Sequence, residues 1–193
     1  MNRIYLIRHA LTAGNEKKRY VGRTDEPLSE RGILSLRGRK APPADVVAVS
    51  PLRRCLQTAD ILFPDRAHVV VRDFAECDFG DFEGKNYAEL AKNADYAAWV
   101  QSGGVLPFPH GEEPAAFRKR CAQAFLRFVQ GLREGQSAAL VVHGGTVMSV
   151  LAAFDRERRD FYDYGLPNGQ GISALWEGGC LTTEGFLWQN SCV

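Results

Sequence analysis

Short apolar runs of four or five residues recur along the chain, and between them lie longer segments whose apolar side chains repeat every three or four residues. Short runs rich in Val, Ile and Leu are typical of buried strands, and the wider spacing is typical of amphipathic helices. The pattern predicts strands at residues 4–7, 46–49, 68–71, 138–142, 172–176 and 186–188. It predicts helices at residues 29–40, 51–62, 113–133 and 144–154.

Residues that start or stop helices mark several of these ends. Ser29 can cap the first helix, and Pro42 with Pro43 stops it. Ser50 followed by Pro51 is a typical helix start, with serine as the cap and proline at the first position. Strands that alternate with helices predict an α/β fold, a three-layer α/β/α sandwich around a mostly parallel central sheet.

Length and composition fit one globular domain over residues 1–193, since 45% of the residues are hydrophobic and 24% are charged. No internal repeat or linker divides the sequence. A Gly- and Pro-rich loop at 102–111 lies inside the domain, and we expect residues 85–111 to cover the functional site. Tyr96 and Trp99 in this cover either stack on an aromatic ligand or pack as one face of a short helix, which their spacing favours.

The charge balance and the cysteines limit the partners and the compartment. The 24 Lys and Arg residues against 23 Asp and Glu residues give a formal net charge of +1, so no nucleic acid or anionic membrane is expected as a partner. No apolar run approaches the roughly 20 residues of a membrane-spanning helix, and the N-terminus turns polar too early for a signal peptide. The five cysteines are odd in number and form no Cys-x-x-Cys pair, which predicts free thiols and a cytoplasmic protein.

Polar side chains follow three of the predicted strands at the point where each strand ends. Arg8 and His9 follow the first strand, Arg53 and Arg54 follow the second, and His143 follows the fourth. Ligands of open α/β sheets bind at the carboxyl ends of the strands, so we expect these side chains to converge. Imidazoles and guanidinium groups at one rim would form a compact cationic pocket suited to a tetrahedral oxyanion such as phosphate.

Further donors and acids lie near these side chains. Gly144 and Gly145 open the helix after the fourth strand and would add backbone N–H donors, and Asn15 offers a side-chain amide. An acidic loop with interleaved aromatic residues follows the third strand, and a partly desolvated carboxyl there would have a raised pKa and donate a proton to a leaving group. The spacing leaves this choice open among Asp73, Glu76, Asp78, Asp81 and Glu83.

Five ordered segments of the chain, at residues 6–15, 22–32, 50–59, 78–84 and 141–146, resemble the motifs of the histidine phosphatase superfamily, also called the phosphoglycerate-mutase-like family. The first carries an arginine–histidine signature at Arg8 and His9, and the last contains a histidine followed by two glycines. The match covers nearly the whole chain. Leu11 departs from the pattern, because many members have Glu or Gln there, but that side chain is outside the catalytic set.

The resemblance implies a role for each candidate residue. His9 would be the nucleophile that becomes phosphorylated and Glu76 the general acid, while Arg8, Arg54 and His143 would hold the phosphoryl oxygens. The implied substrate contacts come from Asn15, Gly22, Arg23 and Gly144. Cys77, beside the implied acid, is expected to pack as a small apolar side chain.

These roles fit the chemistry of phosphoryl transfer. The transition state spreads negative charge over three equatorial oxygens, where two guanidinium groups and a protonated His143 would stabilise it. A neutral His9 would attack in line, with its tautomer fixed by a hydrogen bond from the other ring nitrogen to a backbone carbonyl. Because the arginines supply the positive charge, no metal and no cofactor is expected.

The same pocket serves both phosphatases and phosphoglycerate mutases in this family. The mutases are longer, with an extra segment after the acidic loop, so 193 residues favour hydrolysis. We therefore expect a phosphoric monoester hydrolase of the histidine acid phosphatase type, which acts on a small-molecule phosphomonoester and releases inorganic phosphate. Residues 95–99 and 107–117 are similar to the corresponding part of α-ribazole phosphatases, which makes α-ribazole phosphatase one alternative. Phosphoglycerate mutase is the other. The oligomeric state stays open, a homodimer included.

Two alternatives come from other classes of protein. A non-catalytic anion-binding module would use the same pocket, although the presence of His9, Glu76 and His143 argues against it. A metal-dependent phosphoesterase would use the two histidines and neighbouring carboxylates as metal ligands. The sequence has no Gly-x-x-x-x-Gly-Lys-Ser/Thr loop, so a P-loop nucleotide hydrolase is not expected.

Overall fold

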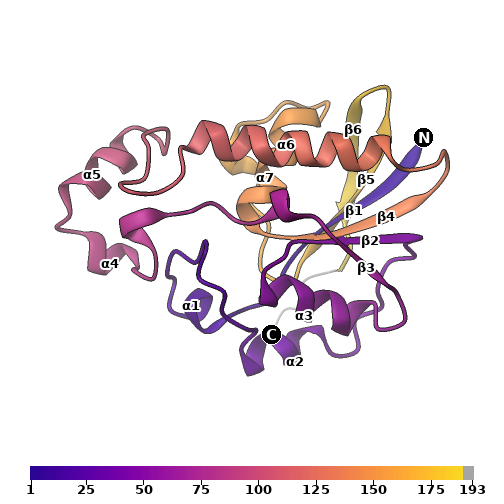
Figure 1. Cartoon of the computed structure of the whole chain (residues 1–193), viewed down its shortest axis with the longest axis horizontal. Helices are drawn as coiled ribbons and strands as arrows, with labels where there is room; N and C mark the ends of the chain where they lie inside the picture. The colour runs from indigo at the N-terminus through magenta and orange to yellow at the C-terminus, as the bar shows by residue number, and fades with distance from the viewer. Residues whose placement is uncertain (189–193) are drawn as a thin grey trace.

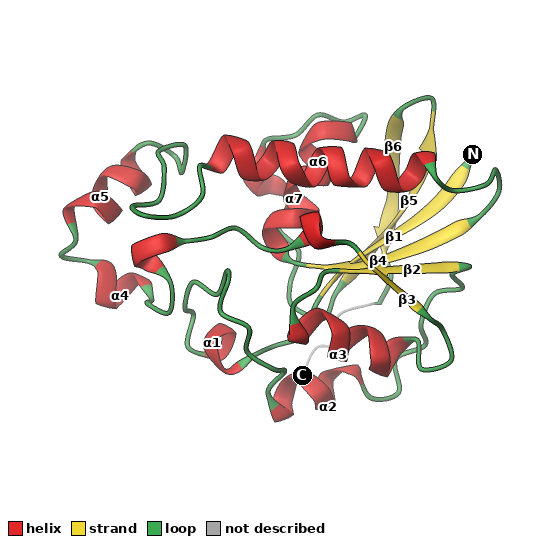
Figure 2. Cartoon of the chain, viewed as in Figure 1, coloured by secondary structure: helices red, strands yellow, loops and turns green. Residues whose placement is uncertain are grey.

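A six-stranded sheet forms the centre of the computed structural model, which describes residues 1–188 (Figures 1 and 2). The strands are β1 (Asn2–Arg8), β2 (Val46–Val49), β3 (His68–Val70), β4 (Ser137–Val142), β5 (Gly171–Glu177) and β6 (Cys180–Phe186). Their order across the sheet is β3-β2-β4-β1-β5-β6. The first four in this order are parallel, and β5 and β6 extend the sheet with antiparallel pairing.

Helices cover both faces of this sheet (Figure 1). The helices are α1 (Ala13–Glu16), α2 (Glu30–Leu36), α3 (Arg53–Leu62), α4 (Tyr87–Leu90), α5 (Ala94–Gln101), α6 (Pro114–Gln130) and α7 (Gly144–Phe154). α6 and α7 lie on one face, and α2 and α3 lie on the other. Side chains of β1 alternate between the two faces: Ile4 and Leu6 join the first core, Tyr5 and Ile7 the second. The predicted three-layer α/β/α sandwich with a mostly parallel sheet is therefore confirmed.

The ends of several predicted elements differ from the structure; the helix predicted at 113–133, for example, ends at Gln130 with Gly131 as its C-cap. The helix predicted from Pro51 begins at Arg53 with Leu52 as its N-cap, because the Ser50 hydroxyl bonds to His143 instead of capping the helix. Ser29 does cap α2, but this helix ends at Leu36 and not at residue 40, since Gly38 adopts a left-handed conformation with φ of +74°.

The last strand was also predicted in the wrong place. β6 covers Cys180–Phe186 and not residues 186–188, because Gly178 and Gly179 adopt positive φ and form a tight turn directly after β5. Trp188 follows the strand, and its indole N–H donates to the Lys40 carbonyl. The structure also contains α1, α4 and α5, which the apolar pattern did not predict; they are short, and the side chains of Thr12, Asn86 and Asn93 cap them.

The sequence predicts free cysteines and no membrane-spanning helix. Cys55, Cys77, Cys121 and Cys180 are free thiols, and Cys192 lies outside the described residues. Over residues 1–188, every helix is too short or too polar to cross a bilayer.

Candidate active site

The register of the sheet places the two predicted histidines next to each other. In the parallel pair of β1 and β4, Arg8 is opposite Val142, so the residues that follow, His9 and His143, leave the sheet at the same level. Their ring centroids are 5.2 Å apart, with an interplanar angle of 67°. The convergence expected from two distant segments of the sequence is therefore present in the structure.

His9 is a neutral imidazole with one free ring nitrogen. Its side chain is buried, and Nδ1 lies 2.7 Å from the carbonyl oxygen of Ala10. Since a carbonyl only accepts, Nδ1 carries the proton and Nε2 keeps its lone pair. Burial lowers the pKa of His9 well below its usual value, and the charges of Arg54 and Arg8 lower it further. His9 thus remains unprotonated on Nε2 into the acidic range.

His143 differs from the sequence-based expectation of a protonated ring. It is fully buried, and its Nε2 lies 2.6 Å from the hydroxyl of Ser50, the residue after β2. Burial lowers the pKa of His143 well below its usual value, with further lowering by Arg54 and His9. The ring is therefore neutral in this structure, because burial and the neighbouring charges disfavour a protonated imidazole.

Arg54 and Arg8 bring two guanidinium groups to the histidines. Arg54, in the first turn of α3, is fully buried and donates from Nη1 to the Thr24 carbonyl at 2.7 Å and from Nη2 to the Gly22 carbonyl at 2.8 Å. Arg8 donates from Nη1 to the carbonyl of Leu166 at 2.7 Å. The Nε–H groups of both arginines are buried and have no acceptor among the described residues. A phosphoryl oxygen would satisfy such donors.

Glu76 is the carboxyl that shares a cavity with His9. Its Oε1 accepts from the Cys77 N–H at 3.0 Å, and its Oε2 accepts at 3.1 Å from the N–H of Gly145 in the first turn of α7. Burial raises the pKa of Glu76 despite these two donors and the nearby Arg54 and Arg8. A carboxyl with a raised pKa holds a proton that it can donate.

The other four carboxyls of the acidic loop have different partners. Asp73 pairs with Arg127, Asp78 with Arg23 and Asp81 with His110, whereas Glu83 accepts from the N–H groups of Gly22 and Thr24. None of these four borders the cavity that contains His9. The geometry therefore favours Glu76, as the resemblance implied.

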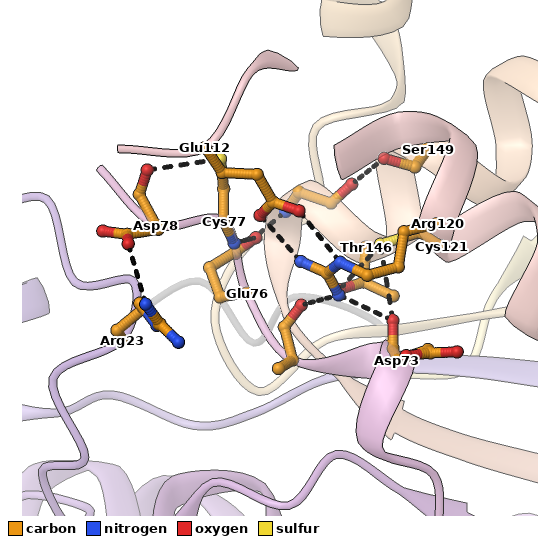
Figure 3. A network of polar contacts seen from close by, with 12 residues as sticks. Arg23, Asp73, Glu76, Cys77, Asp78, Glu112, Arg120, Cys121, Thr146 and Ser149 are labelled. Carbon is orange, nitrogen blue, oxygen red and sulfur yellow. Dashed lines mark hydrogen bonds and ion pairs between the residues drawn. The ribbon is translucent and has the colours of Figure 1, made fainter. Parts of the chain in front are cut away.

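Arg120 of α6 holds the segment that carries Glu76, and this arrangement is shown in Figure 3. Its Nη1 donates to the carbonyls of Asp73 at 2.8 Å and Ala75 at 3.0 Å, and its Nε and Nη2 bind both oxygens of Glu112. The sequence analysis did not identify Arg120 or Glu112. The only sequence signal is an Arg eight residues after a Glu at a helix start, and this pattern alone is not specific.

A cavity of about 260 Å³ opens beside His9. Of the predicted site residues, it is bordered by Arg8, His9, Asn15, Glu76 and Gly144. Asn15 binds the side chain of Asn168 through Oδ1, which leaves its NH₂ group for a ligand. Gly144 allows the Arg8 guanidinium to approach, since a Cβ there would lie 3.1 Å from Cζ of Arg8. Arg54 and His143 do not border this cavity, and both are fully buried.

The structure does not place Gly22 and Arg23 in this cavity. A Cβ at Gly22 would lie 1.9 Å from the carbonyl oxygen of Cys77, so glycine allows two loops to approach closely. Arg23 is 75% exposed and pairs with Asp78 at 3.0 Å. It borders a second cavity of about 500 Å³, which Glu76 also borders. Their contact with substrate stays a prediction. Arg53 is likewise exposed.

Residues 85–111 contribute part of the cavity wall. Trp99, Gly104 and Phe108 border it, while Tyr87 and His110 are exposed outside it. Tyr96 stacks on Trp99 with ring centroids 6.0 Å apart, so this pair packs within the cover as the helical spacing favoured. Cys77 also borders the cavity, and burial raises the pKa of its thiol, which keeps it protonated.

A metal-dependent site would need a cluster of ligand side chains. Within residues 1–188, no group of three or more His, Cys, Asp or Glu side chains is arranged to hold a metal ion. His9 and His143 are instead surrounded by guanidinium groups, which repel a cation.

Known proteins resemble this chain over most of its length. The sequence matches the model of the "Histidine phosphatase superfamily (branch 1)" over residues 4–186. Phosphoserine phosphatase 1 of Hydrogenobacter thermophilus is 28% identical over 188 residues, which are 93% of this chain and 82% of that protein. Adenosylcobalamin/alpha-ribazole phosphatase of Escherichia coli is 30% identical over 159 residues, 78% of this chain and 77% of that protein. A phosphoglycerate mutase structure from Thermus thermophilus has a TM-score of 0.75 at 27% identity, with 97% and 99% of the two chains covered.

Proposed function

Since the chain belongs to the histidine phosphatase superfamily, we propose that it is a metal-independent phosphomonoesterase that hydrolyses a small phosphorylated metabolite through a phosphohistidine on His9. The observation that carries the proposal is the state of His9, whose Nδ1 donates to a backbone carbonyl and whose Nε2 keeps its lone pair. Glu76 and Arg8 border the same cavity. A nucleophile, an acid and a cation therefore act on one bound phosphomonoester.

In the first step, Nε2 of His9 attacks phosphorus while the bond to the leaving-group oxygen breaks. Glu76 gives its proton to that oxygen, so an alcohol leaves and the phosphoryl group remains on His9. The Nε–H groups of Arg8 and Arg54 bind the equatorial oxygens, where negative charge is concentrated in the transition state. A contact of His143 with a phosphoryl oxygen stays a prediction, because Ser50 and Cys55 lie against its ring nitrogens.

In the second step, the Glu76 carboxylate takes a proton from water, and the water oxygen attacks phosphorus. The bond to Nε2 breaks, inorganic phosphate leaves, and His9 is again neutral. Glu76 ends the cycle protonated, as its raised pKa favours. One carboxyl can serve in both steps because the water oxygen takes the position that the leaving-group oxygen has vacated.

The names of similar proteins indicate which phosphomonoesters to test as substrates. Relatives named phosphoserine phosphatase and alpha-ribazole phosphatase support hydrolysis of small phosphomonoesters. A neighbour titled phosphoglycerate mutase has the same fold, so 3-phosphoglycerate belongs in any substrate panel. We assign hydrolysis rather than transfer, with the histidine acid phosphatase class of activity and a cytoplasmic location.

We expect purified protein to release p-nitrophenol and phosphate from p-nitrophenyl phosphate in buffer that contains EDTA. The arginines provide the positive charge that a metal would otherwise supply, so chelation should leave the rate unchanged. The measurement is the initial rate with EDTA and with added Mg²⁺, Mn²⁺ or Zn²⁺. Activity that EDTA removes and a metal restores would establish a metal-dependent phosphoesterase. Phosphate binding without turnover would establish an anion-binding module.

Glu76→Gln should lower kcat/KM by about 10²- to 10³-fold for alkyl phosphates but far less for p-nitrophenyl phosphate. An alkoxide needs a proton to leave, whereas p-nitrophenolate does not. Equal losses on both substrate types contradict the general-acid role. Asp78→Asn is the matched control, because Asp78 lies in the same loop but pairs with Arg23 outside the His9 cavity.

The same variant tests the pH dependence. The pKa of His9 is lowered, so on the acid side the wild-type kcat/KM falls only when the pH is low enough to protonate Nε2. The pKa of Glu76 is raised, so the acid form persists toward neutral pH and the rate falls as Glu76 loses its proton. With an alkyl phosphate, the alkaline fall should be absent in Glu76→Gln.

A further inference from the structure

Arg118 is one of three arginines, with Arg8 and Arg19, in the wall of the cavity that contains His9. It lies near the start of α6, and its guanidinium carbon is 3.9 Å from the centroid of the Phe161 ring. Phe161 and Tyr162, from the 3-10 turn at Phe161–Tyr164, border the same cavity. The stacking occupies one face of the guanidinium plane and leaves the N–H groups at its edge available.

Arg118 differs from the other two arginines of this cavity because it has no hydrogen-bond or ion-pair partner, whereas each of them has one. Arg8 donates to the Leu166 carbonyl, and Arg19 pairs with Glu89 at 3.0 Å. For Arg118, no oxygen within residues 1–188 accepts a hydrogen bond or forms an ion pair. A half-buried guanidinium without an acceptor is a binding group for an external anion.

The aromatic side chains of the cavity carry no charge, although the buried indole N–H of Trp99 also lacks an acceptor within residues 1–188. Tyr20 packs edge-on against Phe79 with centroids 5.2 Å apart, and its hydroxyl bonds to that of Tyr96. Phe108 packs against Phe79 and Trp99 at 5.2 Å and 5.3 Å. These rings form the core of the cover, so they shape the wall, while Arg118 provides the unpaired charge.

We propose that Arg118 binds a carboxylate on the leaving group, so that the enzyme prefers phosphomonoesters of acids. The inference rests on the proposed function, because the phosphoryl group must lie at His9 for the leaving group to extend toward Arg118. Arg8 and Arg54 neutralise the phosphate dianion, and the charge of Arg118 remains for a second anion. A guanidinium edge matches the two oxygens of a carboxylate, which it binds through two parallel hydrogen bonds.

The test compares substrates that differ only by a carboxylate. One pair is O-phosphoserine and O-phosphoethanolamine, and a second pair with a longer reach is 4-carboxyphenyl phosphate and phenyl phosphate. For each pair, the readout is the ratio of kcat/KM for the acid to kcat/KM for its partner. The ratio is independent of the fraction of folded protein, because both substrates are measured on one preparation.

We expect wild type to favour the acid in one of the pairs, and Arg118→Met to lower that ratio about 10- to 100-fold, mainly through KM. Arg118→Lys keeps the charge without the planar fork and should give an intermediate ratio. Lys119→Met is the matched control, since Lys119 is the next basic residue on α6, is exposed and does not border this cavity.

Two results would overturn the inference. One is a wild type that favours the acid in neither pair, and the other is a ratio that Arg118→Met leaves unchanged. In both cases, hydrolysis of p-nitrophenyl phosphate would show that the proposed function still holds. If wild type does not hydrolyse p-nitrophenyl phosphate, the proposed function is refuted, and this inference with it.

Discussion

His9→Ala is expected to lower kcat for p-nitrophenyl phosphate by about 10⁴-fold or more, because the substitution removes the atom that forms the covalent intermediate. No other side chain of the site replaces it: the Nε2 atom of His143 is engaged by Ser50 at 2.6 Å. The measurement is the rate of p-nitrophenol release, together with detection of the phosphoprotein after an alkaline quench, in which phosphohistidine survives. Wild type should show the phosphoprotein and the variant should not.

His110→Ala is the matched control for that experiment. His110 is 86% exposed and pairs with Asp81, outside the cavity that contains His9. Its removal should leave the rate and the phosphoprotein unchanged. Retained activity in His9→Ala would contradict the phosphohistidine mechanism, while an equal loss in both variants would mean that the assay reports general damage to the protein.

Arg54→Met is expected to have the second largest effect, because it changes both catalysis and stability. The guanidinium binds the buried carbonyl of Gly22 and the part-buried carbonyls of Val21 and Thr24, so its loss leaves these acceptors unpaired and should lower the free energy of unfolding by about 2–5 kcal/mol. Loss of a buried cation from the phosphoryl site should lower kcat/KM by about 10²- to 10³-fold in the protein that remains folded.

Two measurements separate these effects. Urea unfolding gives the stability change, and the rise in Tm caused by inorganic phosphate reports binding to the folded protein. Phosphate should raise Tm in wild type and much less in Arg54→Met. Arg53→Met is the control, because Arg53 is the exposed neighbour in the first turn of α3 and should change neither quantity. A full phosphate-induced rise in Arg54→Met would contradict the role of Arg54.

The sequence predicted the layers of the fold because they depend on the period of apolar residues. The runs at β1, β2 and β4 are buried on both faces, so they are apolar throughout and easy to identify. The end of α2 and the position of β6 depend on left-handed glycines, and a glycine in a sequence does not reveal its φ angle. The short helices α1, α4 and α5 depend on capping rather than on an apolar face.

The candidate site was predictable in part for a similar reason. Arg8, His9 and His143 directly follow apolar runs, so the rule for the carboxyl ends of strands applies to them. The rule does not select Glu76, because the Glu76 carboxyl is held in place by the N–H of Gly145, a residue distant in sequence. The neutral state of His143 and the unpaired Arg118 depend on neighbours in three dimensions, and spacing along the chain does not report them.

The hydrogen bonds from Arg54 to the backbone at residues 21–24 affect how strongly the protein binds its ligand. A free arginine side chain loses about 2 kcal/mol of rotamer entropy when it is immobilised. Here that loss occurs when the chain folds, so an arriving oxyanion meets a donor already held in place. Preorganisation of this kind increases the affinity for any tetrahedral anion, whatever group is attached to it. Discrimination among substrates therefore depends on the residues around the phosphate site, because they contact the leaving group, which is the part that differs from one ester to another.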